Sequence, residues 1–292
     1  MRNDFAIFII THGHPDRQIT YDTLRNCGYS GKIFLVVDNT DATIQQYIDN
    51  YGTDNILVFD KNYYINSDRF DNGTNTPIYA CAIYARRAVE DMAKTMNLKY
   101  FAMADDDIKK IVIRYPVNNA LKRVNIDDMD KILEAHIELL DAQPIACIGF
   151  GGVQNYFGGA NVFSADSLSK PTIPYQFFLR KTEKPVRWSC WYGEDDVEAY
   201  FNTTTGNLWF ASLYVMIEAM PNGTGSMATT YATLNSYTMS FAELRYFPGL
   251  LRVYKRPKSK ASIFGVVRKT SDWFPKILNE KYKIKEACNG TD

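Results

Sequence analysis

Three consecutive aspartates, Asp105, Asp106 and Asp107, directly follow the apolar run YFAMA. Adjacent carboxylates repel one another, so water, basic side chains or a metal ion must offset the cost of placing them together. Residues i and i+2 of a strand point the same way, so Asp105 and Asp107 are expected to face one Mg²⁺ or Mn²⁺ ion while Asp106 faces elsewhere. A solvated strand end is the alternative, because an Asp-x-Asp pattern alone is not specific.

A second acidic group, GEDDVE, occupies residues 193–198 beside Trp188 and Trp191. Aromatic rings can stack on the apolar face of a sugar, and a carboxylate can accept a proton from a hydroxyl group. Glu194, Asp195, Asp196 and Glu198 are therefore candidates for the carboxylate that accepts this proton. The alternative is an acid-rich first turn of a helix, which acidic residues also favour.

The stretch THGHPD, residues 11–16, follows the first apolar run. A threonine hydroxyl, two imidazoles and the backbone N–H groups of a helix start all suit a nucleotide. We therefore take Thr11, His12 and His14 as candidate nucleotide contacts. A helix-capping turn with surface histidines is the other interpretation.

The first half of the chain alternates between apolar runs typical of strands and helical patterns. Strands are predicted over residues 5–13, 32–38, 55–60, 100–107 and 145–153, and helices over 15–26, 42–52, 77–97 and 127–141, with another beginning near Glu194. This alternation predicts an α/β fold with a Rossmann-like, mostly parallel sheet flanked by helices. Ligands of such sheets bind at the carboxyl ends of the strands, where Asp38 and the aspartate triplet would lie. A long polar loop is predicted over 61–75.

Charge is distributed unevenly, although 33 basic and 33 acidic residues balance over the 292-residue chain. Residues 245–285 hold 12 Lys and Arg against 2 Asp and Glu, a balance of +10. A polyanionic partner would suit this segment, and a solvated lysine-rich tail is the alternative. Its densest part offers contacts to DNA or to a diphosphate through Lys255, Arg256, Lys258 and Lys260.

Several classes of protein are disfavoured. No apolar run reaches the roughly 18 residues of a membrane span, and the first residues lack a cleavage signal. The five cysteines are scattered without a Cys-x-x-Cys pair, which indicates reduced thiols in a cytoplasm. No P-loop, dinucleotide-binding glycine motif or Gly-x-Ser-x-Gly elbow is present.

Four motifs in order resemble the glycosyltransferases of GT-A fold, and more narrowly the TET-associated group. This group is related to the base J glucosyltransferase and is found in phages that decorate modified DNA bases. The motifs are FIITHGHPDRQITYDTLRNCGYSGKIFLVVDNTD, NSDRFDNGTN, ARRAVEDMAKTMNLKYFAMADDD and WYGEDDVE, which together cover most of residues 5–206. The turn departs from the group in having His14 where arginine is common, and no histidine after His136 can serve as a late metal ligand.

The resemblance implies a UDP-sugar donor held by residues 1–150 and an acceptor held by an irregular half, residues 151–292, of one compact domain. Asp105 and Asp107 would hold Mn²⁺ or Mg²⁺, and Asp195 or Glu194 would be the general base of an inverting transfer. The remaining donor contacts would come from Thr11, His12, His14, Asp38, Asp68, Arg86 and Asp106.

The implied acceptor is the hydroxymethyl group of 5-hydroxymethylcytosine in double-stranded phage DNA, in the host cytoplasm. The basic segment favours DNA, and Trp191 or Tyr192 would stack on a flipped base. The sugar is glucose by default or a pentose such as arabinose. Protein or glycan acceptors, a non-catalytic nucleic-acid-binding domain and a nucleotidyltransferase remain as alternatives.

Overall fold

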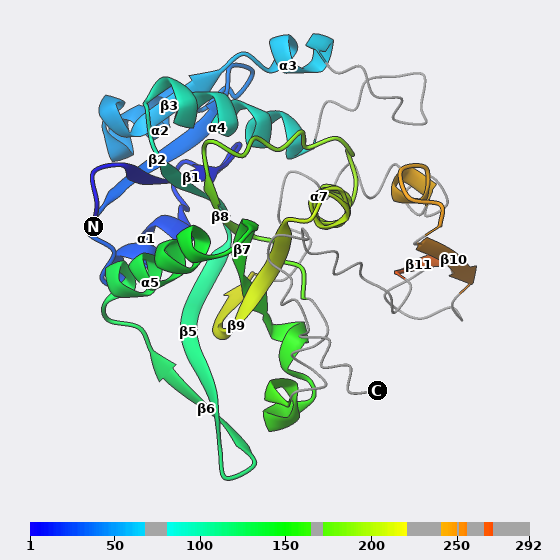
Figure 1. Cartoon of the computed structure of the whole chain (residues 1–292). Helices are drawn as coiled ribbons and strands as arrows, with labels where there is room; N and C mark the ends of the chain where they lie inside the picture. Colours follow the sequence, from blue (N-terminus) through cyan, green and yellow to red (C-terminus); the bar gives the residue numbers. More distant parts are fainter. Residues whose placement is uncertain (68–80, 165–171, 221–240, 250, 256–265, 271–292) are drawn as a thin grey trace, which may run out of the picture.

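A nine-stranded sheet organises the computed structural model, which describes residues 1–67, 81–164, 172–220, 241–249, 251–255 and 266–270 (Figure 1). Its strands are β1 (Phe5–Ile10), β2 (Lys32–Asp38), β3 (Ile56–Phe59), β4 (Tyr100–Asp105), β5 (Ile108–Val117), β6 (Ala120–Asn125), β7 (Ile145–Gly152), β8 (Phe177–Lys181) and β9 (Leu208–Ala219). Their order is β3-β2-β1-β4-β8-β7-β9-β5-β6. A separate antiparallel pair is formed by β10 (Leu251–Lys255) and β11 (Val266–Thr270).

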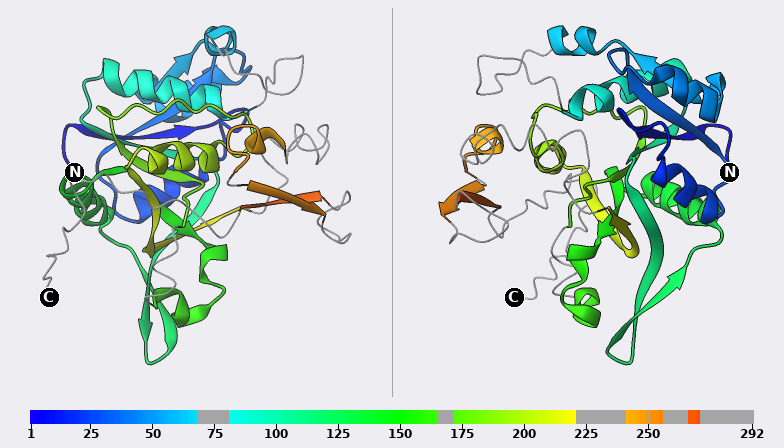
Figure 2. Two further views of the ribbon diagram at one scale, coloured as in Figure 1. Left: turned by 45° about the vertical axis from the view of Figure 1, so that its right-hand side comes forward. Right: turned by 180° about the vertical axis from the view of Figure 1, so that it is seen from behind.

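Helices lie on both faces of the large sheet (Figure 2). They are α1 (Ile19–Asn26), α2 (Ile44–Tyr51), α3 (Lys61–Ser67), α4 (Ile83–Thr95), α5 (Met129–Ala142) and α7 (Glu194–Thr204), with 3₁₀ turns η1 (Thr53–Asn55), η2 (Val153–Tyr156) and η3 (Gly159–Phe163). The predicted α/β fold is therefore confirmed, including the helix that begins at Glu194.

Parallel pairing is confined to part of the sheet. The strands β3, β2, β1 and β4 are parallel neighbours, as are β7 and β9, whereas the other neighbouring pairs are antiparallel. Parallel neighbours need a long crossover connection, which the helices of the first half supply. The connection between β5 and β6 is only two residues long, so these strands must run antiparallel. The sheet is thus mixed rather than mostly parallel.

Strand β1 shows how the sequence builds two cores. Phe5, Ile7 and Ile9 face the core that contains residues of α1 and α5, whereas Ala6 and Phe8 face the core that contains residues of α4. Successive side chains of a strand point to opposite faces, so an unbroken apolar run is what a strand covered on both sides requires.

Two predicted segments differ in detail. The helix expected from residue 15 begins at Ile19, because residues 11–16 form a turn held by side chains of neighbouring elements. The loop expected over 61–75 starts with α3, whose first turn is capped when the Asp60 carboxylate accepts the N–H of Asn62 at 3.0 Å. Residues 68–75 lie outside the described part of the chain, and the division near residue 150 stays a prediction.

Gly28 closes α1 in the left-handed conformation, with φ +83°. The N–H of Tyr29 reaches back to the carbonyl of Leu24 and that of Gly28 to Arg25, which satisfies carbonyls at the helix end. A Cβ at Gly28 would overlap the backbone carbonyl of Asp127, so both the conformation and the space exclude a side chain.

We expect Gly28→Ala to lower the free energy of unfolding by about 2–4 kcal/mol, because it adds overpacking to left-handed strain. Gly159→Ala is the matched control. Gly159 has φ +60°, but its added Cβ would meet no atom within 4 Å, so about 1–2 kcal/mol is expected from the positive φ alone. Denaturant melts of the two variants test this, and equal losses would contradict the overlap with Asp127.

Candidate active site

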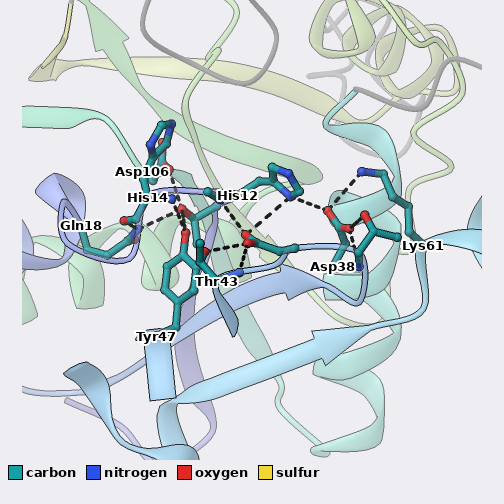
Figure 3. A network of polar contacts seen from close by, with 12 residues as sticks. His12, His14, Gln18, Asp38, Thr43, Tyr47, Lys61 and Asp106 are labelled. Carbon is teal, nitrogen blue, oxygen red and sulfur yellow. Dashed lines mark hydrogen bonds and ion pairs between the residues drawn. The ribbon is translucent and has the colours of Figure 1, made fainter. Parts of the chain in front are cut away.

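Gln18, Tyr47 and Asp106 (Figure 3) come together at the hydroxyl of Thr11, the residue after β1. Its hydroxyl donates to the Asp106 carboxylate at 2.6 Å, accepts from the Gln18 side chain at 2.9 Å, and lies 3.1 Å from the Tyr47 hydroxyl. The His14 N–H donates to the same Tyr47 hydroxyl at 2.8 Å. The network therefore brings together three of the predicted nucleotide contacts, Thr11, His14 and Asp106.

A second network surrounds Asp38 at the end of β2 (Figure 3). Its carboxylate lies 2.9 Å from His12 Nδ1 and 3.1 Å from Lys61 Nζ. Burial opposes ionisation of Asp38, but the hydrogen bonds from His12 and Thr40 and the charge of Lys61 lower its pKa overall. The hydrogen bond to Asp38 in turn raises the pKa of His12, and the nearby Asp41 adds to this rise. An ionised aspartate beside a half-exposed imidazole is thus presented at the strand end.

Asp41 shapes the turn that carries His12 and His14. Its carboxylate accepts the N–H of Gly13 at 2.7 Å and both the N–H and the hydroxyl of Thr43, at 2.8 and 2.6 Å. Gly13 has φ +73°, a conformation that glycine adopts without strain. Sequence reasoning missed Gln18, Asp41, Tyr47 and Lys61. The signal available for Asp41 and Lys61 was their place directly after predicted strands.

The aspartate triplet forms a turn, not an extended strand end. Strand β4 ends at Asp105, and Asp106 with Asp107 turns into β5. Thr20 of α1 holds this turn because its hydroxyl donates to the carbonyl of Asp105 at 2.6 Å and accepts the N–H of Ile108 at 2.8 Å. The expected i, i+2 alternation along one strand is therefore wrong, and the turn sets the directions of the carboxylates instead.

The three carboxyl groups are costly to ionise where they stand. Burial raises the pKa of each, and that of Asp105 reaches about 7 because Asp107, Glu194 and Asp106 repel its charge while Arg86 only partly offsets the rise. Asp107 Oδ1 is buried and has no hydrogen-bond partner. A cation bound beside these groups would lower their pKa values, and without one they bind protons more readily than free aspartates.

Arg86 of α4 brings the two acidic motifs together. Its guanidinium lies 3.4 Å from the Asp105 carboxylate, 3.4 Å from Glu194 and 3.7 Å from Asp195. The side chain is only 2% exposed, and it lies over the rings of Phe178 and Trp188, with centroids 4.6 and 5.1 Å away. Burial by itself lowers the pKa of Arg86, but the three carboxylates raise it above its usual value.

One guanidinium against three carboxyl groups would leave two negative charges uncompensated if all three were ionised, and the raised pKa values of Asp105 and Asp195 reflect that cost together with burial. Within the described ranges, no three His, Cys, Asp or Glu side chains form a complete metal cage. Mg²⁺ and Mn²⁺ beside a diphosphate do not require a complete cage of protein ligands. One or two carboxylates suffice, because phosphates and water supply the other oxygens. Asp105 and the orphaned oxygen of Asp107 fit such a partial site.

Buried side chains also hold the loop that precedes α7 and leads to Glu194. Glu90 of α4 pairs with Arg180 of β8 and accepts the Trp188 indole N–H at 3.2 Å. Trp188 has φ +49°, and its carbonyl accepts from Arg87 at 2.9 Å. The Glu198 carboxylate accepts the N–H of Ser189 at 2.9 Å. The loop that leads to Glu194 is thereby held at several points, none of which the sequence pattern indicated.

The two aromatic residues predicted to stack on a base differ in exposure. Trp191 is 4% exposed and packs in the core beside α7, so its ring is not presented for stacking. Tyr192 is half-buried, with its ring centroid 5.7 Å from that of Trp191. Of the pair, only Tyr192 suits the predicted contact.

Other predicted contacts cannot be placed. Asp68, Arg256, Lys258 and Lys260 lie outside the described residues, and for Lys255 only the backbone, in β10, is described. None of the helices in the described part of the chain has the length and apolar character needed to span a bilayer.

The family model of the TET-associated glycosyltransferases matches residues 5–217. The chain belongs to this family. The match covers both acidic motifs and the arginine that joins them, and it confirms the resemblance drawn from the sequence. The protein is therefore a glycosyltransferase. No curated protein matches the sequence.

Three solved structures are similar to the TET-associated glycosyltransferase described here. S. aureus TarS 1–349 in complex with UDP has 12% identity and a TM-score of 0.41, covering 84% of this chain and 72% of that chain. Glucosyl-3-phosphoglycerate synthase from Mycobacterium tuberculosis in complex with Mg²⁺ and UDP has 10% identity and a TM-score of 0.45, covering 91% and 86%. The mannosyltransferase PcManGT from Pyrobaculum calidifontis in complex with GDP-Man and Mn²⁺ has 10% identity and a TM-score of 0.45, covering 85% and 73%.

Proposed function

We propose that the enzyme transfers glucose, or a pentose such as arabinose, from a UDP-sugar to the hydroxymethyl group of 5-hydroxymethylcytosine in phage DNA. The observation that carries this proposal is the contact of Arg86 with Asp105 on one side and with Glu194 and Asp195 on the other. It unites a carboxylate group suited to a diphosphate with one suited to deprotonating an acceptor. The reaction takes place in the cytoplasm, that of the host if a phage encodes the protein.

The donor nucleotide lies along the carboxyl ends of β1, β2 and β4 in this proposal. The half-exposed His12 ring, held by Asp38, stacks on or hydrogen-bonds the uridine. Thr11, His14 and Asp106 line the same strand ends through the network at Tyr47. Asp68, on the segment that follows α3, is proposed to contact the sugar or the phosphates, with Arg86.

Asp105 and Asp107 are the residues that would hold Mg²⁺ or Mn²⁺. When bound, the cation neutralises charge that develops on the departing diphosphate. Arg86 contributes a permanent positive charge at the same place, because three carboxylates keep it protonated in a buried position.

Asp195 or Glu194 is the general base. The carboxylate takes the proton of the acceptor hydroxyl, whose oxygen forms a bond to the anomeric carbon. The bond between that carbon and the diphosphate oxygen breaks, and UDP leaves with the electron pair, so the configuration at the anomeric carbon inverts. Burial raises the pKa of Asp195 well above that of a free aspartate, which makes it the stronger base when ionised.

The acceptor is proposed to be double-stranded DNA. The balance of +10 over residues 245–285 suits a polyanion, with Lys255, Arg256, Lys258 and Lys260 as its densest part. A target base must leave the stack to reach the carboxylates, and Tyr192 is the half-buried aromatic residue next to them.

Nucleoside mass spectrometry tests the proposal after incubation of hydroxymethylcytosine DNA with Mn²⁺ and a panel of UDP-sugars. The expected result is a mass gain of one hexose or pentose on the modified cytosine. No gain while UDP still binds would overturn the DNA acceptor and favour a protein or glycan. No gain and no UDP binding would overturn the proposed donor as well.

The metal role gives a separate expectation for Asp107→Asn. In the proposal the Asp107 oxygen that lacks a hydrogen-bond partner binds the cation. We therefore expect Mn²⁺ to strengthen UDP binding in the parent enzyme, and the factor of this strengthening to be at least tenfold smaller in the variant. Asp22→Asn is the matched control, because Asp22 is an exposed aspartate on α1. Calorimetric titration with UDP, with and without Mn²⁺, measures both. Full metal-dependent affinity in Asp107→Asn would contradict the role assigned to this residue.

A further inference from the structure

The β5–β6 hairpin is a basic arm at one end of the sheet. In each view its turn lies at an extremity of the drawn ribbon (Figures 1 and 2). Residues 108–125 contain five basic and no acidic side chains: Lys109, Lys110, Arg114, Lys122 and Arg123. The charge is local to this arm, since the whole chain is neutral.

The register of the hairpin places like charges opposite each other. Asn118 and Asn119 both have positive φ, 47° and 61°, which is the two-residue turn that matches the twist of a hairpin. Val117 then pairs with Ala120, and Arg114 falls directly opposite Arg123. Directly opposite residues share one face of the ladder, and like charges in such pairs destabilise it.

The described part of the chain neutralises this charge only in part. Lys109 pairs with Glu218 at 2.9 Å, and the hydrogen bond from Lys109 lowers the pKa of Glu218 together with the charges of Lys110 and Arg123. No ion pair to a described residue is found for the other four basic side chains. Lys122 and Arg123 are exposed. The Nε of Arg114 is buried and lacks a hydrogen-bond partner, while its guanidinium lies over the Tyr156 ring at 5.6 Å. Lys122 and Arg123 can therefore reach a group outside the chain, whereas Nε of Arg114 is enclosed.

The base of the arm is firmly packed. Val112 of β5 forms a small core with Tyr156, Val162 and Met216, and Leu121 of β6 packs against it. The Tyr156 hydroxyl donates to the carbonyl of Leu213 at 2.7 Å, which anchors η2 on β9. The basic residues therefore extend from a rigid support.

Protection of a sheet edge does not account for the whole pattern. Lysines on an edge strand discourage pairing with other chains, and β6 is such an edge. Arg114, however, is on β5, which pairs with β9 as far as Ile113, and its own partner on the other side is Arg123 of β6. Edge protection gives no reason to place two arginines opposite each other, because such a pair destabilises the ladder.

The arm is connected directly to the candidate active site, because β5 begins at the residue after Asp107. At about 3.3 Å per residue, Arg114 lies roughly 20–25 Å along the strand from that aspartate. Duplex DNA carries one negative charge per about 1.7 Å of its axis, so a duplex engaged at the carboxylates has many phosphates at this reach.

We propose that the β5–β6 hairpin binds the phosphate backbone of the acceptor duplex and sets its position relative to Asp107. This inference rests on the proposed DNA acceptor. The contacts are to phosphates and therefore independent of sequence. They are additional to any contact made by residues 245–285.

The test is binding of an unmodified duplex oligonucleotide to the full-length enzyme, measured by fluorescence anisotropy at several salt concentrations. We expect Lys122→Ala/Arg123→Ala to weaken binding roughly tenfold and to reduce the slope of log K against log [salt] by about 1.8, at about 0.9 per phosphate contact. Lys32→Ala/Lys94→Ala, which removes two exposed lysines elsewhere, is the matched control and should change neither quantity.

Arg114→Gln is the second variant. Added to the double variant, it should reduce the slope of log K against log [salt] by one more unit at most, and it should change Tm little. Equal affinity and slope in the hairpin variant, the control and the parent would overturn the proposal. So would parent enzyme that binds RNA or heparin but no duplex DNA. Transfer to hydroxymethylcytosine is measured separately by mass spectrometry. If the parent enzyme modifies DNA and the hairpin variant binds DNA as tightly as the parent, only the proposed role of the hairpin is rejected. DNA binding through the arm without transfer rejects only the proposed reaction.

Discussion

Asp195→Asn should lower kcat by roughly 10²–10⁴-fold while the affinity for UDP changes by no more than a few-fold. A positioned general base contributes this range, and the amide keeps the shape of the side chain but cannot take a proton. Asp195 is at the first turn of α7 with its carboxylate 3.7 Å from Arg86, and Oδ1 is buried without a hydrogen-bond partner. No hydrogen bond to a described residue occupies this oxygen, and in the proposed reaction it accepts the proton of the acceptor hydroxyl.

The pH dependence follows from the direction of the pKa shift. Burial raises the pKa of Asp195, repulsion from Glu194 adds to the rise, and Arg86 only partly opposes it. Because the base must be deprotonated, kcat should rise with pH well above the range in which a free aspartate titrates. Asp195→Asn should lack this rise. Burial raises the pKa of Asp105 to about 7, and because the proposed role of this residue is in donor binding, its ionisation should appear in the KM for UDP-sugar instead.

Asp196→Asn is the matched control for Asp195→Asn. The two residues are adjacent on α7 and both are buried, but the Asp196 carboxylate lies 3.5 Å from the Tyr175 hydroxyl and is not among the partners of Arg86. We expect its effect on kcat to be less than tenfold. Equal losses in the two variants, or an unchanged pH profile in Asp195→Asn, would assign the base to another residue, with Glu194→Gln the next variant to measure.

The strand ends were predictable because each step depends on local pattern. Apolar runs of strand length marked β1, β2, β3 and β4, and a polar residue after each run placed Thr11, Asp38 and Asp105 at one edge. Parallel order then follows from the long helical connections between the strands. The helix start at Glu194 was equally visible, because acidic residues fill its first turn.

The sequence pattern could not reveal features of the site that depend on contacts between segments far apart in the chain. Arg86 was assigned to the donor, but nothing in the sequence shows that it also reaches Glu194 and Asp195, more than a hundred residues away. Trp191 has the type expected of a stacking residue, and only the packing beside α7 shows that it is buried. No element was predicted over residues 108–125, although a pair of asparagines between two runs that contain apolar residues is a signal of a tight hairpin turn.

Arg86→Met should lower the free energy of unfolding by about 3–5 kcal/mol at pH 8, a fall in Tm on the order of 10 °C. Methionine fills much of the space between Phe178 and Trp188, so the loss is mainly electrostatic. Removal of the guanidinium leaves Asp105, Glu194 and Asp195 without their shared cation. A buried charge that loses its partner costs far more than the pair contributed on balance.

The loss should depend on pH in a definite direction. Without Arg86 the pKa of Asp105 and Asp195 rises further, so the folded variant binds protons that the unfolded chain releases. Stability of the variant therefore falls as pH rises from about 4 through 7, and the difference from the parent should be smaller at pH 5 than at pH 8. Arg187→Met, at an exposed arginine in the loop before α7, is the matched control and should be nearly neutral at both values. A loss in Arg86→Met that is equal at pH 5 and 8 would mean that the arginine acts through packing on the two rings and not by holding the acidic motifs together.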